Sequence, residues 1–249
     1  MAYSIRYFLL ISFFISLSSC NSQKEVANIA VASNFEKTLK VIVKRFKKKH
    51  PESNVNIISG ASGVLTNQIL NKAPFDLFLS ADIKKPQIIY NKTPSLIKPV
   101  VYAVGKLALW IPESEERNRC INVLSKVETL VIANPKTTPY GAASKKILTN
   151  HVIKIEKTIY AANIAQSFLY TKNKFAEAGF VAYSMLKGND EGCQQIFQHR
   201  ELSQSMILLN DDAKDIYNFI LSKEIQNLIE ESGYNTMTSK VLVTTKIKK

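Results

Sequence analysis

Short apolar runs alternate with amphipathic helical segments along the first third of the chain, and this alternation constrains the fold more than any other feature. Three of the runs have the length and composition of buried strands, at residues 26–32, 55–58 and 75–80. Between the first two, apolar side chains recur at helical spacing over residues 35–49, and Pro51 ends the helix. A second helix is predicted at about 64–71. Strand, helix, strand, helix, strand is the order of a parallel sheet with helices on its faces.

The same order restarts in the second half of the sequence. Further strands are predicted at residues 107–111, 129–133, 179–183 and 205–209. Further helices are predicted at residues 142–149, 164–172, 212–221 and 223–231. With 249 residues the chain is long enough for two modest lobes. We predict an α/β protein in which each lobe has a doubly wound, mostly parallel sheet flanked by helices. Lobe I would comprise residues 26–103 and 206–249, and lobe II residues 104–205.

The N-terminus indicates export. Arg6 precedes an apolar run at residues 7–17, which is too short for a permanent membrane span and has the length of a signal-peptide core. The run ends in Leu17-Ser18-Ser19-Cys20, which resembles the lipobox of bacterial lipoproteins, where the cysteine thiol receives diacylglycerol. We predict a signal peptide over residues 1–19, lipidation of Cys20 and a polar tether over residues 20–25. An ordinary cleavage site beside a chance cysteine is the alternative. The predicted location is the periplasm or another extracytoplasmic position, with the lipid anchored in a membrane.

Cys120 and Cys193 are the two cysteines outside this leader. An oxidising compartment permits a disulfide between them. The sequence does not show whether their Cα atoms approach closely enough, so the pairing stays open at this point.

The charge balance favours anionic partners. The chain carries 33 Lys and Arg residues against 20 Asp and Glu residues, a formal net charge of +13. Nucleic acids, lipid surfaces and small anions all suit such an excess, although export argues against nucleic acid. The lysines also form small groups, such as Lys47-Lys48-Lys49, that are typical of solvated helix faces.

Four loops lead into predicted helices and offer small or hydrogen-bonding residues there. They lie at Ser33, Ser62, Tyr140-Gly141 and Asn163-Ile164. The first turn of a helix has free backbone N–H donors and the positive end of the helix dipole, so it suits an anion. Because such loops emerge at the carboxyl ends of strands in an α/β fold, the four could converge on one ligand.

Each of these loops also has a purely structural interpretation. Ser33 with Glu36 would form a capping box that needs no ligand. Ser62 would be a turn residue, Pro139 a helix start and Asn163 a helix cap. The four loops therefore carry weight jointly rather than singly.

Five stretches of the sequence carry a resemblance to a known family. They are Ala30-Val31-Ala32-Ser33, Ser59-Gly60-Ala61-Ser62-Gly63, the stretch 73–82 from Ala73 to Asp82, the stretch 133–141 from Ala133 to Gly141, and Ala178-Gly179-Phe180-Val181. Together they resemble the molybdate-binding proteins of bacterial molybdate ABC importers, from about residue 28 to about residue 234. The resemblance implies a two-lobed periplasmic-binding-protein fold that closes on its ligand.

The resemblance also implies which residues bind. Ser33 and Ser62 would give hydroxyl groups with their neighbouring amides, and Tyr140 and Ile164 would give backbone N–H groups. Some members add a tyrosine hydroxyl from the strand that matches residues 179–183. Here the aligned position is Ala182, with Tyr183 next to it, and neighbouring strand residues point to opposite faces. We take both as candidates for this fifth contact.

These observations predict a solute-binding lipoprotein that captures molybdate or tungstate and delivers it to a membrane permease driven by an ATPase. We expect a monomer, with no cofactor and no metal other than the oxyanion. A second hypothesis keeps the fold and assigns another anion, such as sulfate or phosphate. A secreted hydrolase is the alternative from another class, but Val64 stands where G-x-S-x-G requires its last glycine. The three histidines lie in no recognisable motif and show no metal-ligand spacing, so we expect a binding protein and not an enzyme.

Overall fold

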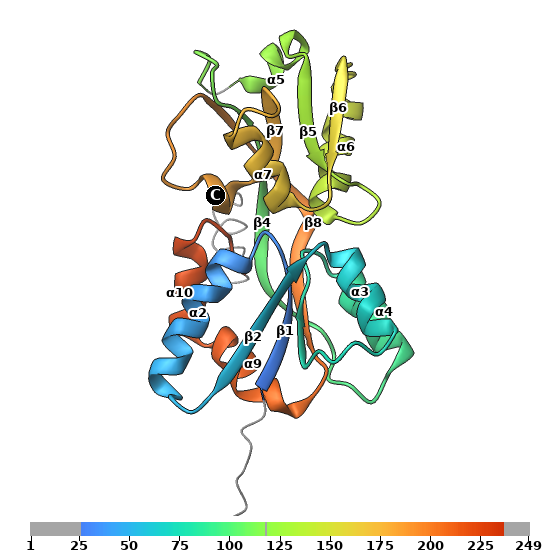
Figure 1. The fold of residues 1–249 in the computed structure, drawn as a ribbon, viewed down its shortest axis with the longest axis vertical. Coiled ribbons are helices and arrows are strands. Elements are labelled where there is room, and N and C mark those ends of the chain that lie inside the picture. Colours follow the sequence, from blue (N-terminus) through green and yellow to red (C-terminus); the bar gives the residue numbers. More distant parts are fainter. Residues whose placement is uncertain (1–25, 118, 237–249) are drawn as a thin grey trace, which may run out of the picture.

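One continuous sheet organises the molecule. The computed structural model describes residues 26–117 and 119–236, and in this part of the chain the strand order is β2-β1-β3-β8-β4-β7-β5-β6. Figure 1 shows the sheet running from one end of the molecule to the other, with helices on both of its faces. We call the end that holds β1 to β3 the lower half and the end that holds β5 to β7 the upper half, as in Figure 1.

The lower half follows the predicted alternation of strands and helices. Its elements are β1 (Val26–Ala32), α2 (Glu36–Lys49), β2 (Asn54–Gly60), α3 (Ser62–Leu70), β3 (Leu77–Leu79) and α4 (Lys84–Lys92). β1 pairs in parallel with β2 and with β3, and Ala32 lies opposite Gly60. Because the two strands end at the same level, the loops that follow them begin side by side.

The upper half repeats this arrangement. Its elements are α5 (Cys120–Val123), the 3-10 turn η1 (Leu124–Lys126), β5 (Thr129–Ala133), α6 (Pro139–Asn150), β6 (Lys157–Ala161), α7 (Ile164–Lys172), β7 (Ala178–Ala182) and α8 (Tyr183–Leu186). β5 pairs in parallel with β6 and with β7, and Ala133 lies opposite Ala161. The loops after β5 and β6 therefore also begin at one level, facing those of the lower half.

Two long antiparallel strands join the halves. β4 (Val100–Ile111) and β8 (Cys193–Leu208) pair along most of their lengths, and the register shifts between Val101 and Ala103 and again between Val104 and Lys106. The chain then forms η2 (Asp211–Ala213), α9 (Lys214–Leu221) and α10 (Lys223–Glu231), which lie beside α2 in the lower half (Figure 1). The predicted lobe boundaries fall within β4 and β8 and stay predictions.

Helices pack through apolar side chains against both faces of the sheet. On one face of the lower half, Leu39, Ile42 and Phe46 of α2 pack with Ile216 of α9 and Ile229 of α10. Helices α3 and α4 cover the opposite face. In the upper half, α5 and α6 pack on one face, while α7 and α8 pack on the other. This confirms a mixed α/β sheet with helices on both sides, which positions the helix starts at the junction of the halves.

Several elements differ from the sequence prediction. Helices α4, α5 and α8 and strand β6 were not predicted. Pro86 interrupts the helical pattern of α4, helices α5 and α8 each span only four residues, and β6 is an edge strand whose side chains are mostly exposed or half-buried. Strands β4 and β8 are longer than predicted: β4 begins at Val100, and β8 begins at Cys193 with a mostly polar segment that pairs with β4. The open question of the cysteines is settled, since Cys120 and Cys193 form a disulfide with their Cα atoms 5.6 Å apart.

The predicted leader, Cys20 and the tether lie outside the described residues. Among the residues that the structure describes, no helix is long and apolar enough to cross a membrane.

Candidate functional site

The four loops singled out in the sequence meet at one small cavity between the halves. The residues that line it are Ala32, Ser33, Asn34, Gly60, Ala61, Ser62, Ala81, Thr138, Pro139, Tyr140 and Ile164. The space for the centre of a water-sized sphere is about 10 Å³, so the two halves lie closed on each other here. Four of the six predicted site residues, Ser33, Ser62, Tyr140 and Ile164, are thus brought together.

Both serines have hydroxyl groups that face backbone donors. Ser33 Oγ accepts a hydrogen bond from the backbone nitrogen of Ala165 at 3.4 Å, and Ser62 Oγ accepts one from Ala81 at 3.1 Å. Among the described residues neither hydroxyl donates to a protein acceptor. A hydroxyl can accept and donate at once, so each retains a proton for a ligand.

The expected capping box at Ser33 does not form. Helix α2 begins at Glu36, and its cap residue Phe35 makes no side-chain cap hydrogen bond. Glu36 instead pairs with Lys40 at 2.5 Å. Partial burial works to raise the pKa of Glu36, but the hydrogen bonds from Lys40 and Ser59 and the Lys40 charge outweigh it, and the pKa is lowered. The Glu36 carboxylate is therefore ionised, and its charge is balanced by Lys40 of the same helix.

Helices α6 and α7 of the upper half are capped so that an N–H group in the first turn of each helix has no acceptor. Thr138 accepts from the backbone nitrogen of Gly141 at 3.0 Å, and Asn163 accepts from that of Gln166 at 3.0 Å. Each cap accepts a hydrogen bond from the N–H group of the third residue of its helix. The N–H group of an earlier residue in the same turn is left without an acceptor. Tyr140 and Ile164 lie at these open positions.

Five backbone N–H groups around the cavity have no hydrogen-bond acceptor among the described residues. They belong to Asn34, Ala61, Ser62, Tyr140 and Ile164. Other amides nearby are occupied: Ser33 donates to Gly60, and Gly63 donates across the junction to Thr137 at 2.9 Å. Buried backbone N–H groups are almost always paired, so five exceptions around one cavity indicate a place for an acceptor ligand.

Asn34 is the site residue that the sequence prediction did not single out. It is 2% exposed and lines the cavity directly after Ser33. Its Nδ2 donates to Gln204 Oε1 at 2.9 Å, and its Oδ1 has no partner among the described residues. A polar residue between Ser33 and the apolar Phe35 was the only signal in the sequence.

Ala182 and Tyr183 lie away from the cavity lining. Ala182 is the last residue of β7, fully buried and opposite Leu107 of β4. Tyr183 begins α8 and packs against the cluster of Trp110 and Val181, with Lys106 Nζ 5.5 Å from its ring centre. The side chains thus belong to opposite faces of the sheet, and a binding role for either stays a prediction.

Three buried tyrosines surround the rear of the site. Burial, with the neighbouring Tyr234, raises the pKa of Tyr102 and of Tyr140 well above the ordinary value, and burial raises that of Tyr234 to about 12. All three hydroxyls therefore stay protonated at neutral pH. Those of Tyr102 and Tyr234 donate hydrogen bonds, while that of Tyr140 accepts one from Gln204 Nε2.

None of the described residues that line the cavity has a charged side chain. Within the described residues there is also no group of three or more histidine, cysteine or acidic side chains placed to hold a metal ion. The site can offer hydroxyl and amide donors held by the starts of α3, α6 and α7, which suits an anion bound by neutral groups.

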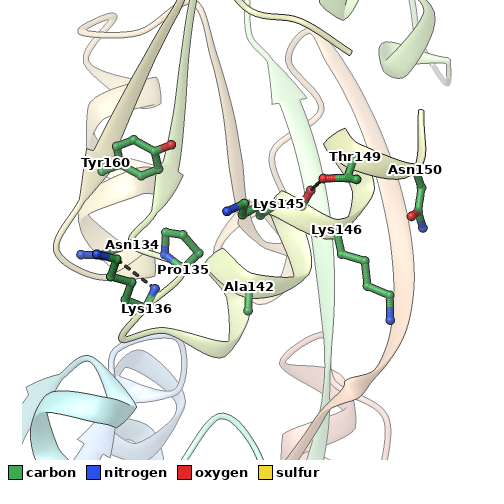
Figure 2. Close-up of a pocket in the computed structure, with 9 residues that line it drawn as sticks. All are labelled: Asn134, Pro135, Lys136, Ala142, Lys145, Lys146, Thr149, Asn150 and Tyr160. Carbon is green, nitrogen blue, oxygen red and sulfur yellow. Dashed lines mark hydrogen bonds between the residues drawn. The ribbon is translucent and has the colours of Figure 1, made fainter. Parts of the chain in front are cut away.

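A much larger hollow lies elsewhere, on the outer side of α6. Its volume is about 840 Å³, compared with about 10 Å³ for the cavity between the halves. Figure 2 shows it lined by Lys145, Lys146 and Thr149 of α6, by Tyr160 of β6 and by the loop from Asn134 to Lys136. None of the unpaired amides opens into this hollow, so size alone does not identify the site.

Comparison with known proteins agrees with this geometry. The bacterial extracellular solute-binding protein family matches residues 27–235. The chain belongs to this family.

Its relatives include curated molybdate-binding proteins. The chain is 30% identical to the molybdate-binding protein ModA of Rhodobacter capsulatus over 220 residues, which cover 83% of this chain and 87% of the relative. It is 34% identical to ModA of Azotobacter vinelandii over 184 residues, covering 72% and 73% of the two chains. The solved periplasmic molybdate-binding protein of Azotobacter vinelandii superposes with a TM-score of 0.76 at 26% identity, covering 84% of this chain and 98% of that one.

These findings confirm the resemblance predicted from the five stretches. The protein is a solute-binding protein of the molybdate ABC transporter family, with the periplasmic-binding-protein fold. Its relatives are named for binding and not for catalysis, which supports the expectation of a transport component.

Proposed function

We propose that the protein binds molybdate or tungstate in the cavity between its halves and delivers it to an ABC permease driven by an ATPase. The observation that carries the proposal is the convergence of two serine hydroxyls and five unpaired backbone N–H groups on one cavity whose described lining residues are all uncharged. The curated relatives, which are named as molybdate-binding proteins, supply the ligand class.

The donors suit a tetrahedral dianion. Ser33, Asn34 and Ser62 approach from the lower half, and Tyr140 and Ile164 from the upper half. Hydrogen bonds to a charged acceptor are shorter and stronger than those between neutral groups, and the helix dipoles add partial positive charge without a lysine or arginine. No carboxylate lines the cavity to accept the O–H of a protonated phosphate, which would be left buried and unpaired.

Binding by both halves implies a hinge. The halves are connected through β4 and β8, whose register shifts near Val104 supply a flexible point close to Gln204 and Met206. The open protein would bind the anion on one half, and the other half would close over it. The closed form would then dock on the permease.

A lysine-rich groove gives the excess positive charge a role at the mouth of the site. The groove lies between α2 and α7, and Ser33 and Ala165, which are in contact with each other, are among the residues that line it. Five lysines line it, namely Lys37, Lys40, Lys172, Lys174 and Lys187. Lys40 and Lys174 are paired with Glu36 and Glu113, but Lys37 and Lys172 form no ion pair with any described residue. Unpaired positive charge at an entrance raises the association rate of an anion.

Membrane attachment is part of the same proposal. Removal of a signal peptide and lipidation of Cys20 would hold a monomeric binding protein near its permease at the extracytoplasmic face. Metabolic labelling with a radioactive fatty acid tests this directly: the wild-type chain should incorporate label, and Cys20→Ser should not. Equal labelling of both would refute the anchor, and light scattering of the purified protein would test the monomer.

Calorimetric titration of the purified chain with molybdate, tungstate, sulfate and phosphate tests the ligand. We expect one-to-one binding of molybdate and tungstate, with sulfate and phosphate much weaker. Stronger binding of sulfate or phosphate would replace the ligand and leave the transport role. Absence of binding by all four would refute the proposed function of the cavity.

A further inference from the structure

A buried hydrogen-bond hub lies behind the cavity, at the point where the two halves and the two connecting strands meet. Its centre is Gln204, a fully buried residue of β8. Gln204 Oε1 accepts from Asn34 Nδ2 at 2.9 Å and from the Tyr102 hydroxyl at 3.0 Å, and Gln204 Nε2 contacts the Tyr140 hydroxyl at 3.2 Å. One side chain thus links a residue of each half of the cavity lining.

The two linked residues are among those whose backbone N–H groups are unpaired at the cavity. Asn34 belongs to the loop between β1 and α2 in the lower half, and Tyr140 belongs to the first turn of α6 in the upper half. The hydrogen bond from each side chain to Gln204 restrains the segment that holds the backbone N–H group of the same residue. The hub therefore helps to set the distance between N–H donors that approach the ligand from opposite sides.

We propose that Gln204 is a positioning residue that couples the two halves of the binding site and holds them in the closed arrangement. This inference rests on the proposed function for its effect on ligand affinity. It assigns Gln204 no contact with the ligand, because Gln204 does not line the cavity.

The surroundings of Gln204 are built for this contact. A side-chain carbon at Gly105, on the neighbouring strand β4, would overlap the Tyr140 hydroxyl and lie 2.6 Å from Gln204 Nε2. Only glycine at this position leaves space for the bond between the halves. Tyr234 closes the opposite side: its hydroxyl donates to the Asn34 carbonyl oxygen at 2.6 Å and accepts from Ser184 at 2.9 Å.

Rotating both side-chain amides by 180° preserves the connection. Gln204 Nε2 would then donate to Asn34 Oδ1, which otherwise has no partner among the described residues, and Gln204 Oε1 would accept from the Tyr140 hydroxyl. The Tyr102 hydroxyl could still donate to the Ser80 carbonyl oxygen, 3.2 Å away. In either orientation Gln204 is the bridge between Asn34 and Tyr140.

The test replaces Gln204 with methionine, which keeps the length of the side chain and removes its hydrogen bonds. Gln195→Met is the matched control, because Gln195 lies on the same strand and its Oε1 accepts from the Ile121 backbone nitrogen at 2.9 Å, far from the cavity. Titration with molybdate should give an affinity about fivefold weaker for Q204M, since the loss of one hydrogen-bonded link between the halves is worth roughly a factor of five. The affinity of Q195M should stay within about twofold of wild type.

Hydrogen–deuterium exchange of the ligand-free proteins gives a readout that a loss of general stability would not reproduce. In Q204M the segments 33–36 and 138–142 should exchange faster, while segments far from the hub should match wild type. Y140F removes the same bond from the other side, so the double variant Y140F/Q204M should lose less affinity than the two single losses combined.

Wild-type affinity and wild-type exchange in folded Q204M would overturn the proposal, as would faster exchange across the whole chain. If wild-type protein bound none of the four oxyanions, the proposed function would fail. The exchange of ligand-free Q204M against Q195M would still decide whether Gln204 couples the halves.

Discussion

The hydroxyl oxygen of Ser33 lies 3.4 Å from the backbone nitrogen of Ala165, and this contact joins the lower half of the molecule to the first turn of α7. A distance of 3.4 Å is long for an N–H···O hydrogen bond, so little is lost if the contact loosens. An anion at the adjacent cavity would draw the hydroxyl proton and the Ile164 N–H group toward the same point. Ser33 thus belongs both to the closure of the halves and to the proposed recognition of the ligand.

Alanine at Ser33 or at Ser62 is expected to weaken oxyanion binding by about 1.5–3 kcal/mol each, the value of a hydrogen bond to a charged group. The double variant should lose about 2–5 kcal/mol, because the two donors share one ligand and their effects need not add. Titration calorimetry with molybdate measures both. Ser232→Ala is the control, since Ser232 donates to Leu228 within α10 and lies outside the cavity. Unchanged affinity in the double variant would remove both serines from the site.

Gly63 tests closure separately from ligand contacts. A Cβ at this position would lie 2.9 Å from the Thr137 carbonyl oxygen and 3.2 Å from Thr137 Cα, both in the opposite half. Gly63→Ala should therefore push the halves apart and weaken binding by about 1–3 kcal/mol. Alanine favours the helix, so the melting temperature should not fall with the affinity. Val64→Ala on the exposed side of α3 is the control, and equal effects of the two changes would argue against the steric interpretation.

The sequence predicted which loops would meet, and the structure places Ser33, Ser62, Tyr140 and Ile164 around one cavity. They could be singled out because helix starts after buried strands have local signals: apolar runs, small residues and caps. Their role in binding stays a prediction. The register that aligns Ala32 with Gly60 and Ala133 with Ala161 then brings the loops to one level. That register depends on pairing between distant segments, which local patterns do not encode.

What the sequence could not give are contacts between distant residues. Gln204 and Asn34 are separated by 170 positions, and no local pattern marks either as buried and hydrogen-bonded. The capping box at Ser33 was expected from spacing alone and is wrong, because Lys40 takes the Glu36 carboxylate and α2 begins later. Strand β8 was predicted too short because most of residues 193–204 are polar, and their place in the sheet depends on pairing with the distant strand β4.

The buried tyrosines predict a loss of stability in alkali. The ordinary tyrosine pKa is 10.0, and the pKa of Tyr234 in the folded protein is about 12. The folded state binds this proton more tightly, so the stabilisation is complete below the unfolded value and is lost as pH rises from about 10 to about 12. Tyr102 and Tyr140 act in the same direction. Denaturant unfolding should give similar free energies at pH 7 and 9 and a lower one at pH 11.

Y234F provides the comparison for this pH dependence. It removes the titrating group and should flatten the alkaline fall, while losing the hydrogen bonds to Asn34 and Ser184 at every pH. A fall equally steep in Y234F would assign the effect to other groups.

The disulfide should stabilise the upper half without shaping the cavity. Cys120 and Cys193 enclose a separation of 73 residues, and a loop of that length corresponds to about 4 kcal/mol of unfolding free energy. The double variant C120A/C193A should lose about this amount in denaturant unfolding, while its molybdate affinity stays close to wild type. Neither cysteine lines the cavity. A large loss of affinity in a folded variant would mean that the far end of the upper half controls closure.

The lysine-lined groove predicts an association rate that depends on ionic strength. Lys37 and Lys172 are exposed beside the entrance, and neither forms an ion pair with a described residue. The variant K37Q/K172Q should bind molybdate about threefold more slowly at low salt, with an unchanged dissociation rate. Because a Debye length of about 10 Å at 0.1 M shortens to about 3 Å at 1 M salt, the difference should vanish at high salt. The control K47Q/K48Q removes the same charge from the last turn of α2, away from the groove. Equal slowing by both variants would show that overall charge, and not the groove, attracts the anion.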